Sequence, residues 1–232
     1  TKGNKGLVSN CYVGADVHLY REQIQVSIET LRAAGICLRL KSSGTIENCY
    51  VVGNFIFEGR TVDGQEPNIY QSVYAELGGI VHYSFGGTIR NCYAVTNHEV
   101  DGEVDVWKNP NSDYIRTVGL VYYLHSGTTT IDNCRYYNPK VSKAVNFNSN
   151  GTDLSTATSV ASEAELANYF NAAPWKPGYY RPVLEGTKIC AATTPEGNET
   201  YLDAIPTEPT QHNYFLKVNL SPSDFNSDFL EK

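Results

Sequence analysis

Apolar and polar residues alternate in a five-residue pattern that recurs four times along the chain. Its first position is apolar and β-branched, its second is polar, and Asn, Cys and then Tyr or Arg follow. Alternation in a strand turns the first side chain inward and the second outward. Because Asn tolerates a left-handed backbone, we place it at a corner, after which Cys points inward and the fifth residue outward. The four copies span residues 8–12, 46–50, 89–93 and 131–135.

A second piece, which begins with glycine, precedes three of these copies. It reads Gly-Ile-Cys-Leu, Gly-Ile-Val-His or Gly-Leu-Val-Tyr, and a turn that contains Gly-Thr separates it from the next copy. Each unit is therefore predicted to contain a short strand, a turn, a bent strand and a variable excursion. The pieces begin at residues 35, 79 and 119, and the turns lie at 43–45, 86–88 and 126–128.

The spacing of the repeats predicts an all-β fold in which successive copies pack on one another. The cysteines of the four copies recur at intervals of 38, 43 and 42 residues, and such repeats stack or form rings. Stacking in a parallel β-solenoid would align the Asn side chains in a corner ladder and the cysteines in an internal column, ~4.8 Å apart. The alternative is a β-propeller, whose blades repeat every 40–45 residues or so. We favour the solenoid because each unit shows two well-matched strands instead of four.

The order of these pieces resembles the GLUG repeat of bacterial extracellular and surface proteins. The resemblance rests on Gly-Ile/Leu-Val, the Gly-Thr turn and Asn-Cys-Tyr, and it covers roughly residues 3–141. It implies a right-handed β-solenoid of about four irregular repeats on a secreted or surface-anchored, adhesin-like protein without a shared catalytic site. The chain departs from the family in a truncated first copy, at residues 5–8, and in longer excursions.

Three regions are predicted along the chain. Residues 1–141 form the solenoid repeats, residues 142–185 form a C-terminal cap over the last coil, and residues 186–232 form an extended tail. This tail is expected to pack on the body or to link to a further partner. The cap contains one predicted helix, 163–170, which starts with Ser162 and Glu165 at capping-box spacing. A closing strand is predicted at 179–184.

The composition limits the possible binding partners and the cellular location of the protein. A net charge of −7 provides no basic footprint for nucleic acid, and the chain has no run of about 18 apolar residues that would span a membrane. Its 17 tyrosines are typical of exported β proteins. The lack of Met suggests a mature fragment whose targeting segment has been removed. We therefore expect an extracellular or outer-cell-surface location.

The six cysteines are predicted to be reduced. Four occupy the same inward position in successive repeats, and Cys37 replaces a Val of the equivalent strands. These positions accept a small apolar residue, as a buried free thiol is. Parallel neighbours also point the same way, which opposes good disulfide torsions. Cys190 lies outside the repeats.

An acidic stretch is the sharpest chemical feature. Glu99, Asp101, Glu103 and Asp105 alternate with Val or Gly, so a strand would carry four carboxylates on one face. Such a face binds Ca²⁺, supplies an acid and a base for glycoside cleavage, or is simply solvated. Solvation is the interpretation that we favour.

The outward tyrosines of the pattern are the second candidate feature. They would stack on sugars or, as we favour, on one another along the coil. Together with the acidic stretch and a nearby indole they make up the candidate ligand-binding residues: Tyr12, Tyr50, Tyr93, Asp101, Glu103, Asp105 and Trp107.

No resident metal or cofactor is expected, and Ca²⁺ is the one ion considered. The Asn-rich segment 146–151 mimics the start of a calcium loop, but it has amides in place of carboxylates and Ala157 where a bidentate Glu is needed. The five histidines lack metal-ligand spacing. His98, beside the acidic stretch, is the one histidine considered for catalysis.

These features predict a non-catalytic secreted or cell-surface module that binds a host or bacterial glycan, or an extracellular protein, in adhesion. One alternative is a carbohydrate-active β-helix enzyme, a lyase or hydrolase that uses the acidic stretch. Another is a structural spacer within a larger surface protein. The repeats keep packing positions and no acid pair, which favours binding.

Overall fold

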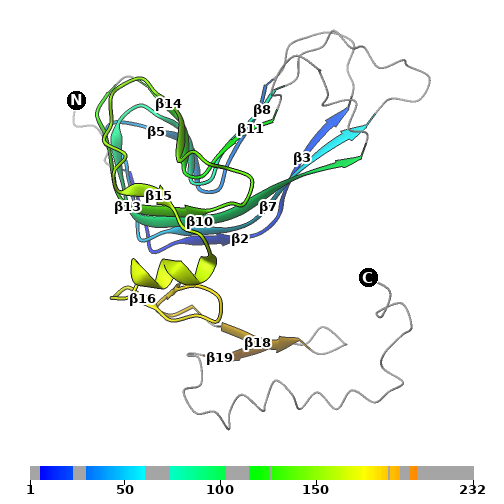
Figure 1. Cartoon of the computed structure of the whole chain (residues 1–232), viewed down its shortest axis with the longest axis vertical. Helices are drawn as coiled ribbons and strands as arrows, with labels where there is room; N and C mark the ends of the chain where they lie inside the picture. The colour runs from blue at the N-terminus through cyan, green and yellow to red at the C-terminus, as the bar shows by residue number, and fades with distance from the viewer. Residues whose placement is uncertain are drawn as a thin grey trace. The chain divides into compact units, whose positions relative to one another are not determined.

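The computed structural model describes residues 6–22, 30–60, 74–102, 115–125, 127–187, 189–193 and 199–202. Strands dominate this part of the chain, whose only helix is a short 3₁₀ helix (Figure 1). The predicted all-β class is therefore confirmed. Two compact units, Thr1–Tyr169 and Phe170–Lys232, divide the chain and are described separately.

Equivalent strands of successive repeats pair in parallel and in register in the first unit. The five-residue pattern aligns Ile46 with Ile89 and Ile131, and Figure 1 shows these strands one behind another. The ladder contains β1 (Leu7–Ser9), β6 (Thr45–Glu47), β10 (Gly87–Gly102), β13 (Thr129–Tyr137) and β15 (Ala157–Ser159). Beyond the Asn corner it is widened by β2 (Tyr12–Gly14), β3 (Val17–Glu22) and β7 (Tyr50–Arg60).

Two further parallel ladders belong to the first unit. The pieces that begin with glycine supply β5 (Cys37–Leu40), β9 (Val81–Ser84), β12 (Val121–Leu124) and β14 (Val145–Asn148). The other ladder contains β4 (Thr30–Ala34), β8 (Tyr74–Gly78) and β11 (Ile115–Val118). Every described strand pair of this unit is parallel and joins successive repeats, whereas a propeller blade needs antiparallel pairs within one repeat.

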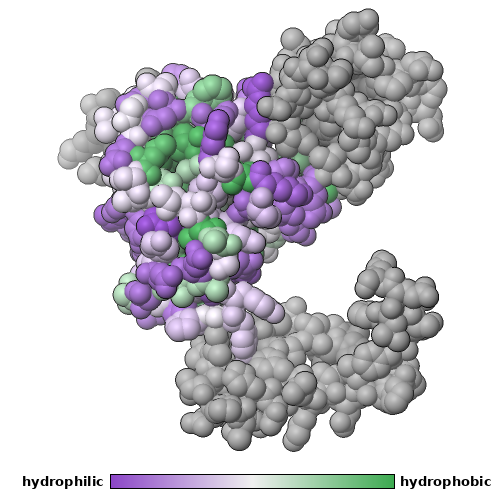
Figure 2. Space-filling view, in the orientation of Figure 1, coloured by the Kyte–Doolittle hydropathy of each residue, from purple (hydrophilic) through white to green (hydrophobic). Residues whose placement is uncertain are grey.

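Two of the ladders continue past residue 141. Val145 lies in register with Val121, and Ala157 with Cys134. Part of the predicted cap thus adds strands to the ladders without carrying the motif. Half-buried apolar side chains pack against the core at this end, namely Val141, Ala144 and Leu154. Figure 2 shows hydrophobic residues among hydrophilic ones over this last repeat.

Each Asn of the five-residue pattern lies at a left-handed corner, as predicted. The φ angles of Asn10, Asn48, Asn91 and Asn133 are 53°, 51°, 52° and 44°. Asn91 Nδ2 donates to Asn48 Oδ1 over 2.5 Å, and Asn133 Nδ2 donates to Asn91 Oδ1 over 2.9 Å. The predicted amide ladder is therefore confirmed for three repeats.

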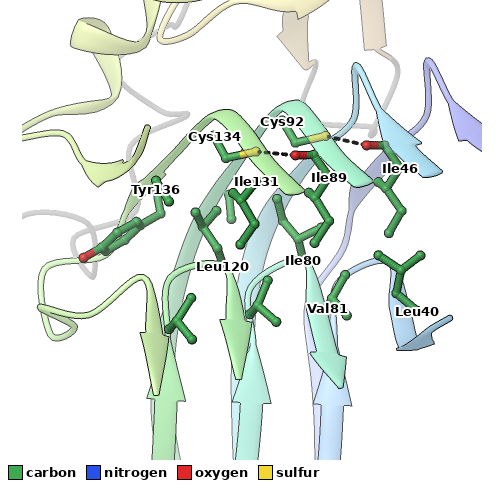
Figure 3. Packing of buried hydrophobic residues seen from close by; sticks show 14 of the residues in the cluster. Leu40, Ile46, Ile80, Val81, Ile89, Cys92, Leu120, Ile131, Cys134 and Tyr136 are labelled. Carbon is green, nitrogen blue, oxygen red and sulfur yellow. Dashed lines mark hydrogen bonds between the residues drawn. The ribbon is translucent and has the colours of Figure 1, made fainter. Parts of the chain in front are cut away.

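The cysteines after the corner are buried in the core, except in the first repeat. Three side chains are fully buried, those of Cys49, Cys92 and Cys134, and Cys11 is exposed. Each buried thiol also approaches a carbonyl of the preceding repeat: Cys92 Sγ lies 3.8 Å from the Ile46 oxygen (Figure 3). Free thiols are observed at Cys11, Cys37, Cys49, Cys92 and Cys134, in agreement with the prediction.

The excursions begin and end as paired strands. β7 and β10 run side by side well beyond the corner, as far as Gly59 opposite Gly102. A second core fills the space between these arms and the β4–β8–β11 ladder, with Phe55, Phe57, Ala75, Leu77 and Ala33 buried. The tips of the excursions, 23–29, 61–73 and 103–114, lie outside the described residues.

The predicted helix is a 3₁₀ helix, η2 (Glu163–Asn168), and its predicted capping box does not form. Ser162 makes no side-chain cap bond. The Glu165 carboxylate accepts a hydrogen bond from the Ala161 N–H over 3.0 Å, one residue before the N-cap. The prediction was wrong in helix type and in its end, because the same residues favour both helix types and 3₁₀ turns are common in short connectors.

The second unit contains two antiparallel pairs in its described residues. β16 (Trp175–Lys176) pairs with β17 (Val183–Leu184), and β18 (Ile189–Thr193) pairs with β19 (Glu199–Leu202). The buried rings of Phe170 and Trp175 lie 4.9 Å apart. The closing strand is thus only two residues long, and the segment predicted to be extended includes a hairpin, whose first strand contains Cys190.

Candidate functional site

The tyrosines predicted to face outward form a self-stacked column. The ring centroids of Tyr12 and Tyr50 are 5.1 Å apart, and those of Tyr50 and Tyr93 are 5.0 Å apart, with nearly parallel planes. Tyr12 is 54% exposed, but Tyr50 and Tyr93 are only 5% and 0% exposed. The prediction of an exposed column is therefore wrong for two of its three members, and self-stacking is observed.

Tyr169, which follows η2, contacts the outer face of β13 beside this column. Arg135 stands in register with Tyr93, and its guanidinium lies 4.0 Å from the Tyr169 ring centroid. Asn133 Nδ2 also donates to the Tyr169 carbonyl over 3.5 Å. Alternation predicts the direction of a side chain and not what covers it, so the sequence pattern missed these contacts.

The acidic stretch is only partly described. Glu99 is exposed, and Asp101 lies in β10 beside Glu58 of β7. Three candidates lie outside the described residues, namely Glu103, Asp105 and Trp107. The four-carboxylate face therefore stays a prediction. Within the described residues, no group of three His, Cys, Asp or Glu side chains is arranged to hold a metal ion.

The Asn-rich turn uses its amides for its own backbone. The Thr152 N–H lies within 3.0 Å of Asn148 Oδ1 and 3.1 Å of Asn150 Oδ1 and donates to both. Asn150 Nδ2 donates to the Gly127 carbonyl over 2.6 Å. These side chains build a structural turn that joins neighbouring repeats.

His98 belongs to the second core and not to the acidic face. Its register partner is the inward-facing Phe55, and its Nδ1 lies 3.3 Å from Thr117 Oγ1. Burial lowers the pKa of His98, and the nearby Lys140 charge lowers it further. His98 is therefore a half-buried residue that packs on the inward side of β10.

A groove that none of the predicted sites covers lies where β4 faces β5, β9 and β12. In β9 the core-facing residues Val81 and Ser84 are three positions apart, so both His82 and Tyr83 leave the core. Tyr122 and Tyr123 repeat this arrangement in β12. The cavity has a volume of about 390 Å³ and is lined by Arg32, Arg39, Tyr83, Phe85, Tyr123 and His125.

Aromatic rings from successive repeats form two rows in the groove. In the first, Tyr123 lies 5.4 Å from Tyr83 and 5.3 Å from Phe147, between ring centroids. In the second, Phe85 lies 4.8 Å from His125. The rings are tilted against one another by 38° to 49°. Phe147 is 47% exposed and the others are half-buried, so part of each ring meets solvent.

Positive charge borders the rings. Arg32 Cζ lies 5.9 Å from the Tyr83 ring centroid, and its Nε lies 3.3 Å from Glu76 Oε2. Arg39 is exposed and stands in register with Tyr83 at the first position of the aromatic row. No carboxylate in the described part of the chain forms an ion pair with Arg39.

A polar cluster around Glu76 supports the groove from behind. The Tyr122 hydroxyl donates to Glu76 Oε1 over 3.1 Å, and the His82 ring stacks on Tyr122 with centroids 5.0 Å apart. His82 Nε2 lies 3.3 Å from Glu76 Oε2 but outside hydrogen-bonding geometry.

Burial sets the protonation of this cluster. Burial lowers the pKa of His82 to about 4, against the opposing effect of the Glu76 charge. Burial likewise raises the pKa of Tyr122 to about 12. Both rings are therefore neutral near pH 7.

The signal for this groove was present in the pieces that begin with glycine. Two adjacent positions carry aromatic residues in two successive repeats, at 82–83 and 122–123. Strict alternation assigns one residue of each pair to the core, whereas in the structure His82 and Tyr122 are buried beside Glu76 and Tyr83 and Tyr123 line the cavity.

The described residues contain no helix long and apolar enough to cross a membrane. Compared with family models, curated proteins and solved structures, the chain matches none of them.

Proposed function

We propose that this chain is a non-catalytic glycan-binding module of an extracellular or cell-surface protein, built on a right-handed parallel β-solenoid. The in-register parallel ladders and the Asn amide ladder support the solenoid. The resemblance of the repeat to the GLUG repeat supports the surface location and a role in adhesion.

The aromatic groove carries the proposal. The apolar faces of sugar rings pack on aromatic rings, and a polar edge then remains free for hydrogen bonds. Tyr83, Tyr123 and Phe147 come from successive repeats, so they follow the stacking direction at the strand spacing of ~4.8 Å. A row of this kind suits an extended polymer, and the cavity volume of about 390 Å³ falls in the usual range of ~300–1,000 Å³ for ligand sites.

Binding without turnover fits the chemistry of the groove. Glycoside hydrolysis needs two carboxyl groups across the scissile bond. None of the residues that line the described cavity is a carboxylate, and Glu76 behind it already accepts hydrogen bonds from Arg32 and Tyr122.

Substitution of the central rings tests the proposal. Tyr123→Ala and Tyr83→Ala should each weaken binding to a glycan identified on an array by about tenfold, since a well-packed aromatic contact contributes about 1–2 kcal/mol. The matched control is Tyr180→Ala, because Tyr180 is 76% exposed and lies in the second unit. Circular dichroism would verify folding of each variant. An array without any hit, or a Tyr123→Ala variant that binds like Tyr180→Ala, would refute the proposal.

A further inference from the structure

The charge of the groove is opposite to that of the whole chain. The chain carries a net charge of −7. In contrast, the residues that line the cavity include two arginines and no carboxylate. Positive charge in the groove attracts a negatively charged ligand. The excess of negative charge on the rest of the chain repels the same ligand, so binding is directed to the groove.

Arg39 is placed to meet an anionic group of such a ligand. It occupies the same register position as Tyr83 and Tyr123, so it extends the aromatic row onto β5. A guanidinium presents a planar fork of donors that matches a carboxylate or a sulfate. Since no described carboxylate pairs with Arg39, this fork is not used by an ion pair within the described residues.

Arg32 supplies a second cation, which the structure holds in place. Its guanidinium contacts both Glu76 and the Tyr83 ring. Across the β4–β8–β11 ladder, Arg32 and Arg116 flank Glu76 in register on the neighbouring strands. One carboxylate therefore stands between two guanidinium groups, and the ladder as a whole adds positive charge to the groove side.

From this arrangement we propose that the groove binds an anionic polysaccharide, whose charge is carried by uronate carboxylates or by sulfate esters. The sugar faces lie on Tyr83 and Tyr123, and the anionic substituents meet Arg39 and Arg32. This inference rests on the proposed glycan-binding function and specifies its ligand.

A glycan fits these observations better than the other common anionic polymer, nucleic acid. Duplex DNA carries one charge per ~1.7 Å, and its binding depends on many Lys and Arg contacts to phosphate. The groove offers two lining arginines within a chain of net charge −7. Such a site can recognise spaced charges on stacked sugar rings but does not neutralise a polyphosphate backbone.

Matched polymer pairs test the inference by isothermal titration calorimetry on the whole chain. Polygalacturonate is compared with its methyl ester, and dextran sulfate with dextran, so that the members of each pair share a sugar backbone and differ in their anionic substituents. We expect at least tenfold tighter binding to one anionic member, and weaker binding as salt is raised. The pair that responds identifies carboxylate or sulfate as the charged group.

Charge-removing variants complete the test. Arg39→Gln should weaken binding to the anionic polymer by about tenfold. Arg90→Gln should leave it unchanged, because Arg90 is an exposed arginine that pairs with Glu47 outside the groove. Equal binding of charged and neutral polymers, or an Arg39→Gln variant that behaves like Arg90→Gln, would overturn the inference while the glycan-binding function stands. Failure to bind any glycan would refute both, and tighter binding to poly(dT) would replace the glycan with single-stranded nucleic acid.

Discussion

The corner asparagines show how one residue type meets two physical requirements. All four have a φ angle between 44° and 53°, a region that costs most L-residues about 1–2 kcal/mol and that Asn and Gly tolerate. The side-chain amides of Asn48, Asn91 and Asn133 also bond to one another. Gly would meet the first requirement and not the second, which explains why Asn recurs at every corner.

Substitutions at Asn91 separate the two effects. Asn91→Gly should lower the free energy of unfolding through loss of the amide bonds, each worth about 0.5–1.5 kcal/mol. Asn91→Ala should lower it by about a further 1–2 kcal/mol, because Ala adds the left-handed strain. Urea unfolding measures both values. Equal stability of the two variants would show that backbone strain does not select Asn here.

At the scale of elements, the sequence pattern predicted the features that recur in every repeat and missed the features that depend on contacts between distant segments. The corner, the inward cysteines and the stacking of Ile46, Ile89 and Ile131 follow from alternation and spacing. The groove depends on bent strands that place Tyr83 and Tyr123 outside the core. The burial of Tyr93 depends on contacts with residues that are distant in the sequence. Such features depend on tertiary packing, which local periodicity does not encode.

The cysteine column predicts a sharp contrast in thiol reactivity. Cys11 is exposed, so it should react rapidly with a thiol reagent in the folded protein. Cys92 is fully buried, and burial raises the pKa of its thiol. The neighbouring Cys92 thiol lowers the pKa of Cys49 to about 7, yet Cys49 is also fully buried, which denies the reagent access.

Labelling followed by mass spectrometry checks this contrast. Cys49, Cys92 and Cys134 should be modified only after unfolding in denaturant, when about six free thiols should be counted in all. Rapid labelling of Cys92 in the folded protein would contradict its place in the core, and two or fewer free thiols in denaturant would contradict the reduced state.

At the scale of the first unit, the same stacking builds the core and the proposed binding surface. Each repeat adds one strand to the ladder behind the groove, so the outer row from Arg39 to Phe147 crosses four strands and spans about 14 Å at the parallel-strand spacing. The polar cluster around Glu76 joins this ladder to the β4–β8–β11 ladder through His82 and Tyr122. The stability of the unit therefore depends on the protonation state of a cluster that also shapes the groove.

Acid should destabilise the fold through His82. An unfolded histidine takes up its proton near pH 6.5, whereas burial, together with the Arg32 charge and against the Glu76 charge, lowers the pKa of His82 to about 4. Between these values the unfolded state binds more protons, so the free energy of unfolding decreases as the pH falls from about 6.5 toward 4. His82→Phe keeps a ring on Tyr122 and removes the titration, so its free energy of unfolding should depend less on pH between 6.5 and 5. Urea unfolding across this pH range measures how the free energy of unfolding depends on pH. An equal dependence in His82→Phe and wild type would show that His82 is not the group responsible.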